Sequence, residues 1–240
     1  MASCPWRLDL SEISKRTYRR LLGKTELGFY WDTVCGIAIT LEHLELEFEV
    51  DNETILSKEN IKNAWIALKR RYPLISSRVE KLPHSEDVEF VIDEDRLDTA
   101  RLGEINIKEA ESAEDVTELI DYLLNGPPSV NSDRTAQLWI INRKDICRRF
   151  HVLLAVAHYA TDGMASATLV KYLCQELSSP SGCIDKNMDI RLRTLLPLED
   201  LYPSISLSRQ RWRRAIASVI YDKRQLRRTV FKVSILHKYG

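Results

Sequence analysis

The sequence lacks the features that carry a chain into or across a membrane. No apolar run in it approaches the roughly 18 residues that span a bilayer. Its start, Met1 to Trp6, has neither the basic stretch nor the apolar stretch of a secretory signal. We therefore expect a cytoplasmic protein with no stable membrane anchor.

Cysteine is scarce and shows no metal-binding pattern. The five cysteines are odd in number and none forms a C-x-x-C pair; they occupy positions 4, 35, 147, 174 and 183. Structural zinc sites usually show closely spaced cysteine pairs, and disulfide frameworks need even numbers. We expect reduced thiols, no metal and no redox cofactor.

An excess of charge of one sign is absent too. Lys plus Arg and Asp plus Glu number 35 each, so the net charge gives no argument for a nucleic-acid partner. One segment departs from this balance, because eight Lys and Arg lie between positions 209 and 228, around Trp212, Ile216 and Val219. Such a segment could bind nucleic acid or anionic lipid. We expect instead a solvated helix face, or a face that packs on further protein.

The sequence does contain interleaved strand and helix patterns. Alternating apolar residues predict a strand between Thr33 and Val50, and a helix begins after Ser57 and ends at Arg71, before a proline. Before these, Arg7 to Leu22 combines a short extended piece with a basic helical one. Further strands are expected over 74–82, 88–92, 136–142 and 149–157, and helices over 112–124, 164–177 and from 199 onward. This order predicts an α/β or α+β fold, in which helices flank a mixed sheet.

The most informative stretch runs from His158 to Gly163. The eight residues before it, Phe150 to Ala157, are apolar enough for a buried strand, and helical apolar spacing follows from Met164 to Leu177. A histidine at the end of a buried strand is held by the sheet while it faces a cleft. This is a suitable place for a general base.

His158, Asp162 and Gly163 form the pattern H-x-x-x-D-G, and here the chain resembles the chloramphenicol-acetyltransferase-like superfamily. Two more elements of the sequence are similar to that superfamily. One is the Arg71-Tyr72-Pro73-Leu74 stretch with Arg78 after it, and the other is the proline-containing stretch Leu195 to Leu201. The similarity is greatest to fungal O-acetyltransferases of secondary metabolism, of the trichothecene type, and to condensation-like domains.

The resemblance implies an activity and a role for each site residue. His158 would remove a proton from a small alcohol or amine as it attacks the thioester of acyl-CoA, which is a cosubstrate rather than a cofactor. Asp162 would turn inward to an arginine and hold the loop that aims His158, with Arg78 as the first candidate partner and Arg71 as the second. Gly163 would permit close approach of the backbone at the turn.

The chain departs from the superfamily pattern at two points. Condensation domains usually carry two consecutive histidines, whereas this chain has Ala157 before His158, which favours acyl-CoA-dependent transferases. The resemblance also covers only about residues 5–225, the N-terminal half of such proteins, and the D-F-G-W-G element is absent. We expect a domain over 1–225 and an irregular tail over 226–240. Because Val233-Ser234 is what a translated intron donor encodes, we interpret the chain as a truncated or mispredicted gene product.

Other interpretations remain open. A half-length chain could be a catalytically silent half-domain that acts only in binding, or it could form a homodimer through the face left by the missing half. His158 and Asp162 could instead hold a metal, or His158 could be an ordinary core histidine. His151, seven residues earlier on the strand, lies on the opposite face and is expected to be structural.

Overall fold

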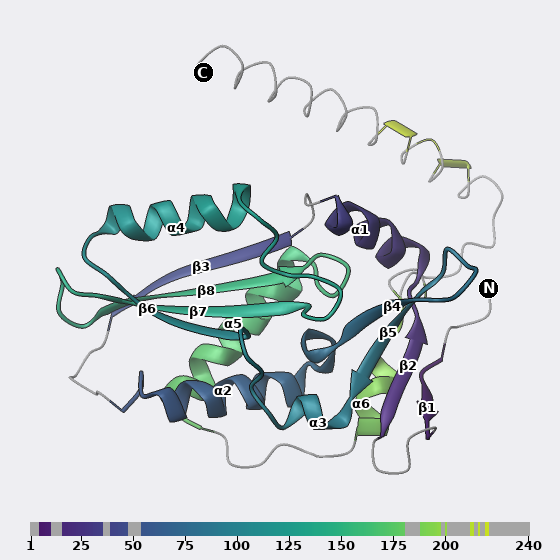
Figure 1. Ribbon diagram of the computed structural model, residues 1–240, viewed down its shortest axis with the longest axis horizontal. Coiled ribbons are helices and arrows are strands. Elements are labelled where there is room, and N and C mark those ends of the chain that lie inside the picture. The colour runs from purple at the N-terminus through teal and green to yellow at the C-terminus, as the bar shows by residue number, and fades with distance from the viewer. Residues whose placement is uncertain are drawn as a thin grey trace. The chain divides into compact units, whose positions relative to one another are not determined.

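The computed structural model describes residues 5–10, 16–35, 39–47, 54–180, 188–197 and 200, and the helical residues 212, 213, 216, 219 and 220. The chain divides into two units, residues 1–201 and 202–240. All named helices and strands belong to the first unit (Figure 1). The predicted tail over 226–240 lies outside the described residues.

The strands of the first unit form two four-stranded sheets. One has the order β1-β2-β5-β4 and is antiparallel throughout. The other has the order β3-β8-β7-β6, in which only β6 and β7 run parallel. The strands are β1 (Arg7–Asp9), β2 (Thr17–Leu21), β3 (Ile39–Glu47), β4 (Arg78–Lys81), β5 (Val88–Asp93), β6 (Ile105–Ala110), β7 (Ala136–Arg143) and β8 (Arg149–Ala157).

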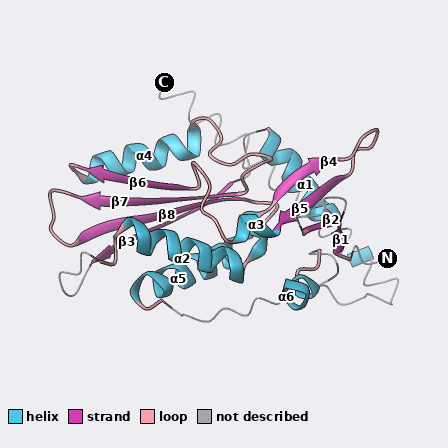
Figure 2. Cartoon of the chain, turned by 60° about the horizontal axis from the view of Figure 1, so that its bottom comes forward, coloured by secondary structure: helices cyan, strands magenta, loops and turns pink. Residues whose placement is uncertain are grey.

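Helices cover both faces of the β3-β8-β7-β6 sheet, with α2 and α5 on one face and α4 on the other (Figures 1 and 2). The helices are α1 (Lys24–Val34), α2 (Lys58–Arg71), α3 (Glu94–Leu97), α4 (Ala113–Asn125), α5 (Gly163–Ser178) and α6 (Met188–Thr194), with a 3-10 turn at Pro73–Ser76. The mixed α/β architecture predicted from the sequence is therefore confirmed, although the strands form two sheets instead of one.

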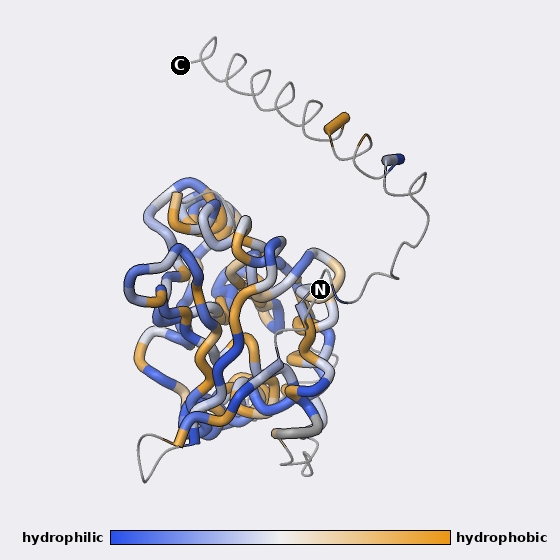
Figure 3. The backbone as a smooth tube through the Cα atoms, turned by 90° about the vertical axis from the view of Figure 1, so that its right-hand side faces the viewer, coloured by the Kyte–Doolittle hydropathy of each residue, from blue (hydrophilic) through white to orange (hydrophobic). Residues whose placement is uncertain are grey.

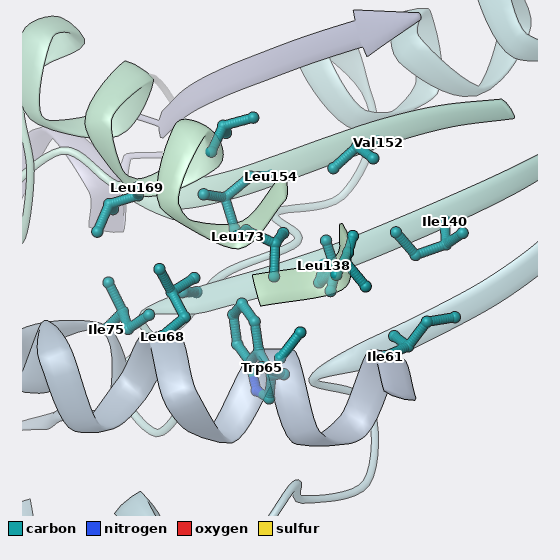
Figure 4. Packing of buried hydrophobic residues seen from close by; sticks show 14 of the residues in the cluster. Ile61, Trp65, Leu68, Ile75, Leu138, Ile140, Val152, Leu154, Leu169 and Leu173 are labelled. Atoms are coloured by element: carbon teal, nitrogen blue, oxygen red, sulfur yellow. The ribbon is translucent and has the colours of Figure 1, made fainter. Parts of the chain in front are cut away.

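The largest core lies between this sheet and the helices α2 and α5. Trp65 of α2 is fully buried and packs among aliphatic side chains from β7, β8 and α5 (Figure 4). Its indole N–H donates to the Glu104 carboxylate at 2.8 Å, so the one polar atom of the ring is satisfied. Hydrophobic and hydrophilic residues are interleaved along the chain of this unit (Figure 3), as expected for elements with one buried face.

β8 is an interior strand of its sheet, between β3 and β7. From Phe150 to Ala157 every residue is buried, because helices cover both faces of its sheet. At its C-terminal end a second apolar cluster joins this strand to the other sheet. The cluster contains Ala155, Ala157 and Tyr159 from this end of the strand, and Phe90 and Val79 from the other sheet. The end of β8 is therefore the place where the two sheets meet.

Several predicted boundaries are corrected by the structure. The strand expected from Thr33 to Val50 begins only at Ile39, because α1 continues to Val34. The strand expected over 74–82 begins with a 3-10 turn and becomes extended only at Arg78. The basic piece expected to be helical runs from Ser11 to Arg16, and all of it except Arg16 lies outside the described residues. Most of the segment after 199 lies outside them too.

Candidate active site

His158 is the first residue after β8, and four residues separate it from the start of α5. It lies half-buried in a pocket of about 160 Å³ at the junction of the two sheets. The walls come from α1, from the 3-10 turn, from the 158–162 turn and from the residue Leu196 that follows α6. The prediction that a histidine at the end of β8 faces a cleft is therefore confirmed.

The main chain fixes which nitrogen of His158 carries the proton. Nδ1 lies 2.9 Å from the carbonyl oxygen of Thr161, three residues later in the same turn. A carbonyl oxygen can only accept, so Nδ1 is the protonated nitrogen of the neutral ring. Nε2 then carries the lone pair. The imidazole is thus held in the tautomer that a general base needs.

Phe29 of α1 is a site residue that the sequence did not reveal. Its ring lies flat on the imidazole of His158, with centroids 3.9 Å apart and planes inclined by 13°. The two residues are 129 positions apart in sequence, and no local pattern could have paired them. Glu26 of the same helix also lines the pocket, where it is buried and bound to Arg20 by two hydrogen bonds of 2.8 and 2.9 Å.

Asp162 does not occupy the place expected for it. Its side chain is exposed and accepts a hydrogen bond of 2.7 Å from the backbone N–H of Ala165, so it is the N-cap of α5. Among the described residues no arginine forms an ion pair with it. The expectation that Asp162 turns inward to an arginine is therefore wrong for this structure. It orders the turn that carries His158 by capping the helix instead.

The two candidate arginines have other partners. Arg78 lies on β4 and pairs with Asp93 at 2.9 Å and with Glu80 at 2.8 Å. Arg71 ends α2, and its guanidinium lies 5.0 Å from the centre of the Tyr172 ring of α5. Both stabilise packing between elements of the fold. The structure brings neither to the pocket of His158.

Gly163 is the first residue of α5, where the sequence suggested a close approach of the backbone. A Cβ atom built at this position meets no atom within 4 Å among the described residues. Its backbone is also outside the left-handed region, since Gly103 is the one described glycine with a positive φ. The described structure gives no steric reason for glycine at position 163.

His151 lies on the opposite face of β8, as predicted. Its Nδ1 is 2.9 Å from Nε2 of His43 on β3, and Arg143 approaches its other nitrogen at 3.5 Å. Burial, followed by the nearby charge of His43, lowers the pKa of His151. Within the described ranges no group of three or more His, Cys, Asp or Glu residues could hold a metal ion.

The fold has known relatives, although no protein-family model and no curated protein matches the sequence. The TRI3 trichothecene 15-O-acetyltransferase from Fusarium sporotrichioides superposes with a TM-score of 0.58 at 15% identity, over 76% of this chain and 39% of that protein. The condensation domain of the monacolin K polyketide synthase MokA superposes with a TM-score of 0.54 at 12% identity, over 73% of this chain and 38% of that domain.

The chain shares its fold with part of each of these two proteins. At these identities the likeness is one of fold, and it confirms the predicted chloramphenicol-acetyltransferase-like architecture. The chain spans less than two fifths of the length of either solved structure. Among the described helices, none has the length and apolar character needed to cross a bilayer.

Proposed function

We propose that this chain transfers an acyl group, such as acetyl, from acyl-CoA to the hydroxyl or amine of a small secondary metabolite, with His158 as general base. The observation that carries the proposal is the hydrogen bond from Nδ1 of His158 to the Thr161 carbonyl, which leaves Nε2 free to accept a proton. The acyltransferase fold supports the choice of acyl transfer over other reactions that use a general base.

The reaction can be written with this one residue. Nε2 takes the proton of the acceptor O–H or N–H while the acceptor atom attacks the thioester carbonyl carbon. The carbon–sulfur bond then breaks, and the imidazolium returns its proton to the departing thiolate. The products are an ester or amide and free CoA. A positioned general base typically contributes roughly 10²–10⁴-fold to such a step.

The size of the pocket limits what it holds. Pockets that enclose a whole ligand usually measure about 300–1,000 Å³, whereas this one is about 160 Å³. It therefore has room for the reacting ends of the two substrates, with the remaining parts outside it. The apolar wall formed by Phe29, Leu74 and Leu196 favours a hydrocarbon group next to the acceptor hydroxyl.

The test is thiol release from acetyl-CoA by the full chain with a panel of hydroxylated terpenoids. Wild type should release CoA, and His158→Ala should reduce the rate by about 10²–10⁴-fold while leaving the circular dichroism spectrum unchanged. His43→Ala is the matched control, because it removes an exposed histidine of β3 that lies outside the pocket. Equal rates for wild type and His158→Ala would refute the role of His158.

The small pocket also favours a second candidate, a catalytically silent chain that only binds its ligands or another protein. This candidate predicts no thiol release from wild type with any acceptor of the panel. Calorimetry with acetyl-CoA then separates two forms of it. A saturable binding heat indicates a binding protein for acyl thioesters. If no binding heat is measured, the chain is an interaction protein with no CoA site.

A further inference from the structure

The contact between Phe29 and His158 has an energy that depends on the charge of the imidazole. The rings are nearly parallel, with centroids 3.9 Å apart, so they are stacked face to face. Between two neutral rings such a stack gains little electrostatic energy, because both faces are electron-rich. A cation placed over the face of a ring is attracted to it within about 6 Å. Protonation of His158 therefore strengthens the attraction between the two rings.

The ring of Phe29 is held in place by contacts that do not involve a substrate. The N-terminus of α1 is fixed to β2 by the buried pair between Arg20 and Glu26. One residue after Phe29, Tyr30 packs edge-on against Tyr159, with ring centroids 5.9 Å apart. The phenyl ring therefore faces His158 before any ligand binds.

The other ionisable groups around the pocket do not provide the same stabilisation. Glu26 is already paired with Arg20, and Asp162 is exposed and bound to the N–H of Ala165. Burial raises the pKa of Tyr159, so its hydroxyl stays neutral. The remaining wall residues from the 3-10 turn and from the segment after α6, Leu74 and Leu196, are apolar.

We infer that Phe29 is a positioning residue of the proposed reaction: its ring holds the plane of His158 and stabilises the imidazolium formed when Nε2 takes the acceptor proton. The inference rests on the proposed function for its catalytic meaning, but the contact itself can be measured without a substrate. It adds to the site a residue on α1, an element far from the H-x-x-x-D-G segment in sequence.

The test is an NMR titration of His158 in the full chain, with its signal assigned by its loss in His158→Ala. Phe29→Leu keeps an apolar side chain over the imidazole but removes the aromatic face. We expect it to lower the titration midpoint by about 0.4–0.7 pH units. Phe29→Tyr retains the aromatic face, so in this variant His158 should have the same titration midpoint as in the wild type. Phe29→Met is a second apolar variant in case the leucine variant does not fold.

Trp31→Leu is the matched control, because it removes another aromatic ring of α1, which contacts Tyr30 and Lys81. It should leave the titration of His158 unchanged. An unchanged or raised midpoint in Phe29→Leu would overturn the inference, and so would an equal fall in Phe29→Tyr.

The two proposals fail separately. If the midpoint falls as expected but the wild type releases no thiol, the stabilising contact stands and acyl transfer does not. If thiol release depends on His158 but the midpoint does not move, only the role of Phe29 is lost. In an active enzyme Phe29→Leu should reduce kcat more than it changes KM, because imidazolium forms only during the reaction.

Discussion

At His158 the position of one proton is set by a main-chain atom. The acceptor for Nδ1–H is the carbonyl of Thr161, not its side chain. The tautomer therefore depends on the path of the turn from 158 to 161, and that path is held by the helix that begins directly after it. Asp162 caps this helix, so it contributes to the site by ordering the turn.

Substitutions at Asp162 separate capping from ion pairing. Asparagine caps a helix about as well as aspartate, but it cannot form an ion pair. We expect Asp162→Asn to release thiol at the wild-type rate and to change the free energy of unfolding by no more than about 0.5 kcal/mol. Asp162→Ala should lower the free energy of unfolding by about 1 kcal/mol. Urea denaturation measures the free energy of unfolding of both variants, and the thiol assay measures their activity. If Asp162→Asn lost activity as fully as His158→Ala, the aspartate would have an ionic role that the capping contact does not explain.

At the scale of elements, α1 is the part that completes the pocket, and one buried ion pair holds it. The side chain of Arg20 on β2 is fully buried, and Glu26 binds it while also accepting the N–H of Gly23 at 2.6 Å. Removing one partner of such a pair leaves an uncompensated charge in the interior. The stability of α1 and the geometry of the pocket therefore depend on the same carboxylate.

Glu26→Ala tests this dependence. We expect the free energy of unfolding to fall by about 3–5 kcal/mol, because Arg20 would remain buried without its counter-charge. Asp32→Ala is the control on the same helix, since Asp32 is exposed and should change stability by no more than about 0.5 kcal/mol. If urea denaturation gave similar losses of unfolding free energy for both variants, the buried pair would stabilise the protein no more than an exposed charge does.

The sequence predicted the end of β8 well and the opposite wall of the pocket not at all. Phe150 to Ala157 is a long apolar run followed by polar turn residues, and such a run has few alternatives to a buried strand. The N-cap of α1 is Gly23, which has no side chain to mark the start of a helix. The three aromatic residues of α1 are consecutive, so they point in different directions around the helix and do not form an apolar stripe. The capping role of Asp162 could have been recognised, because an aspartate directly before a helical pattern is a typical N-cap.

At the scale of the whole chain, the zero net charge conceals an uneven distribution. Residues 202–240 contain ten Lys and Arg but one Asp, so the first 201 residues carry the matching acidic excess. The described residues of the second unit are helical, and Trp212, Ile216 and Val219 are exposed by 70%, 55% and 54%. Spacings of four and three residues place these three side chains on one helix face.

This exposed apolar face predicts self-association of the full chain. The homodimer expected from the sequence is tested by neither the fold nor the comparisons, and it stays a prediction. We expect light scattering to report a mass above that of one chain, and Trp212→Glu to reduce that mass towards the monomer. Arg213→Glu is the control, because it changes charge at an exposed neighbour and keeps the apolar face. A monodisperse wild-type monomer would contradict the prediction.

The order β3-β8-β7-β6 has a consequence for solubility as well as for the pocket. β3 lies at the sheet edge, and the edge away from β8 has no partner strand among the described residues. Unpaired strand edges are templates on which further strands can add, as in amyloid. Here the strand carries Glu42, Glu45 and Glu47, and charged side chains on an edge strand are one of the devices that oppose such addition. In the described part of the chain the side chains of this strand, and not a further strand, therefore protect the edge, so replacing these glutamates with apolar residues should favour fibre growth.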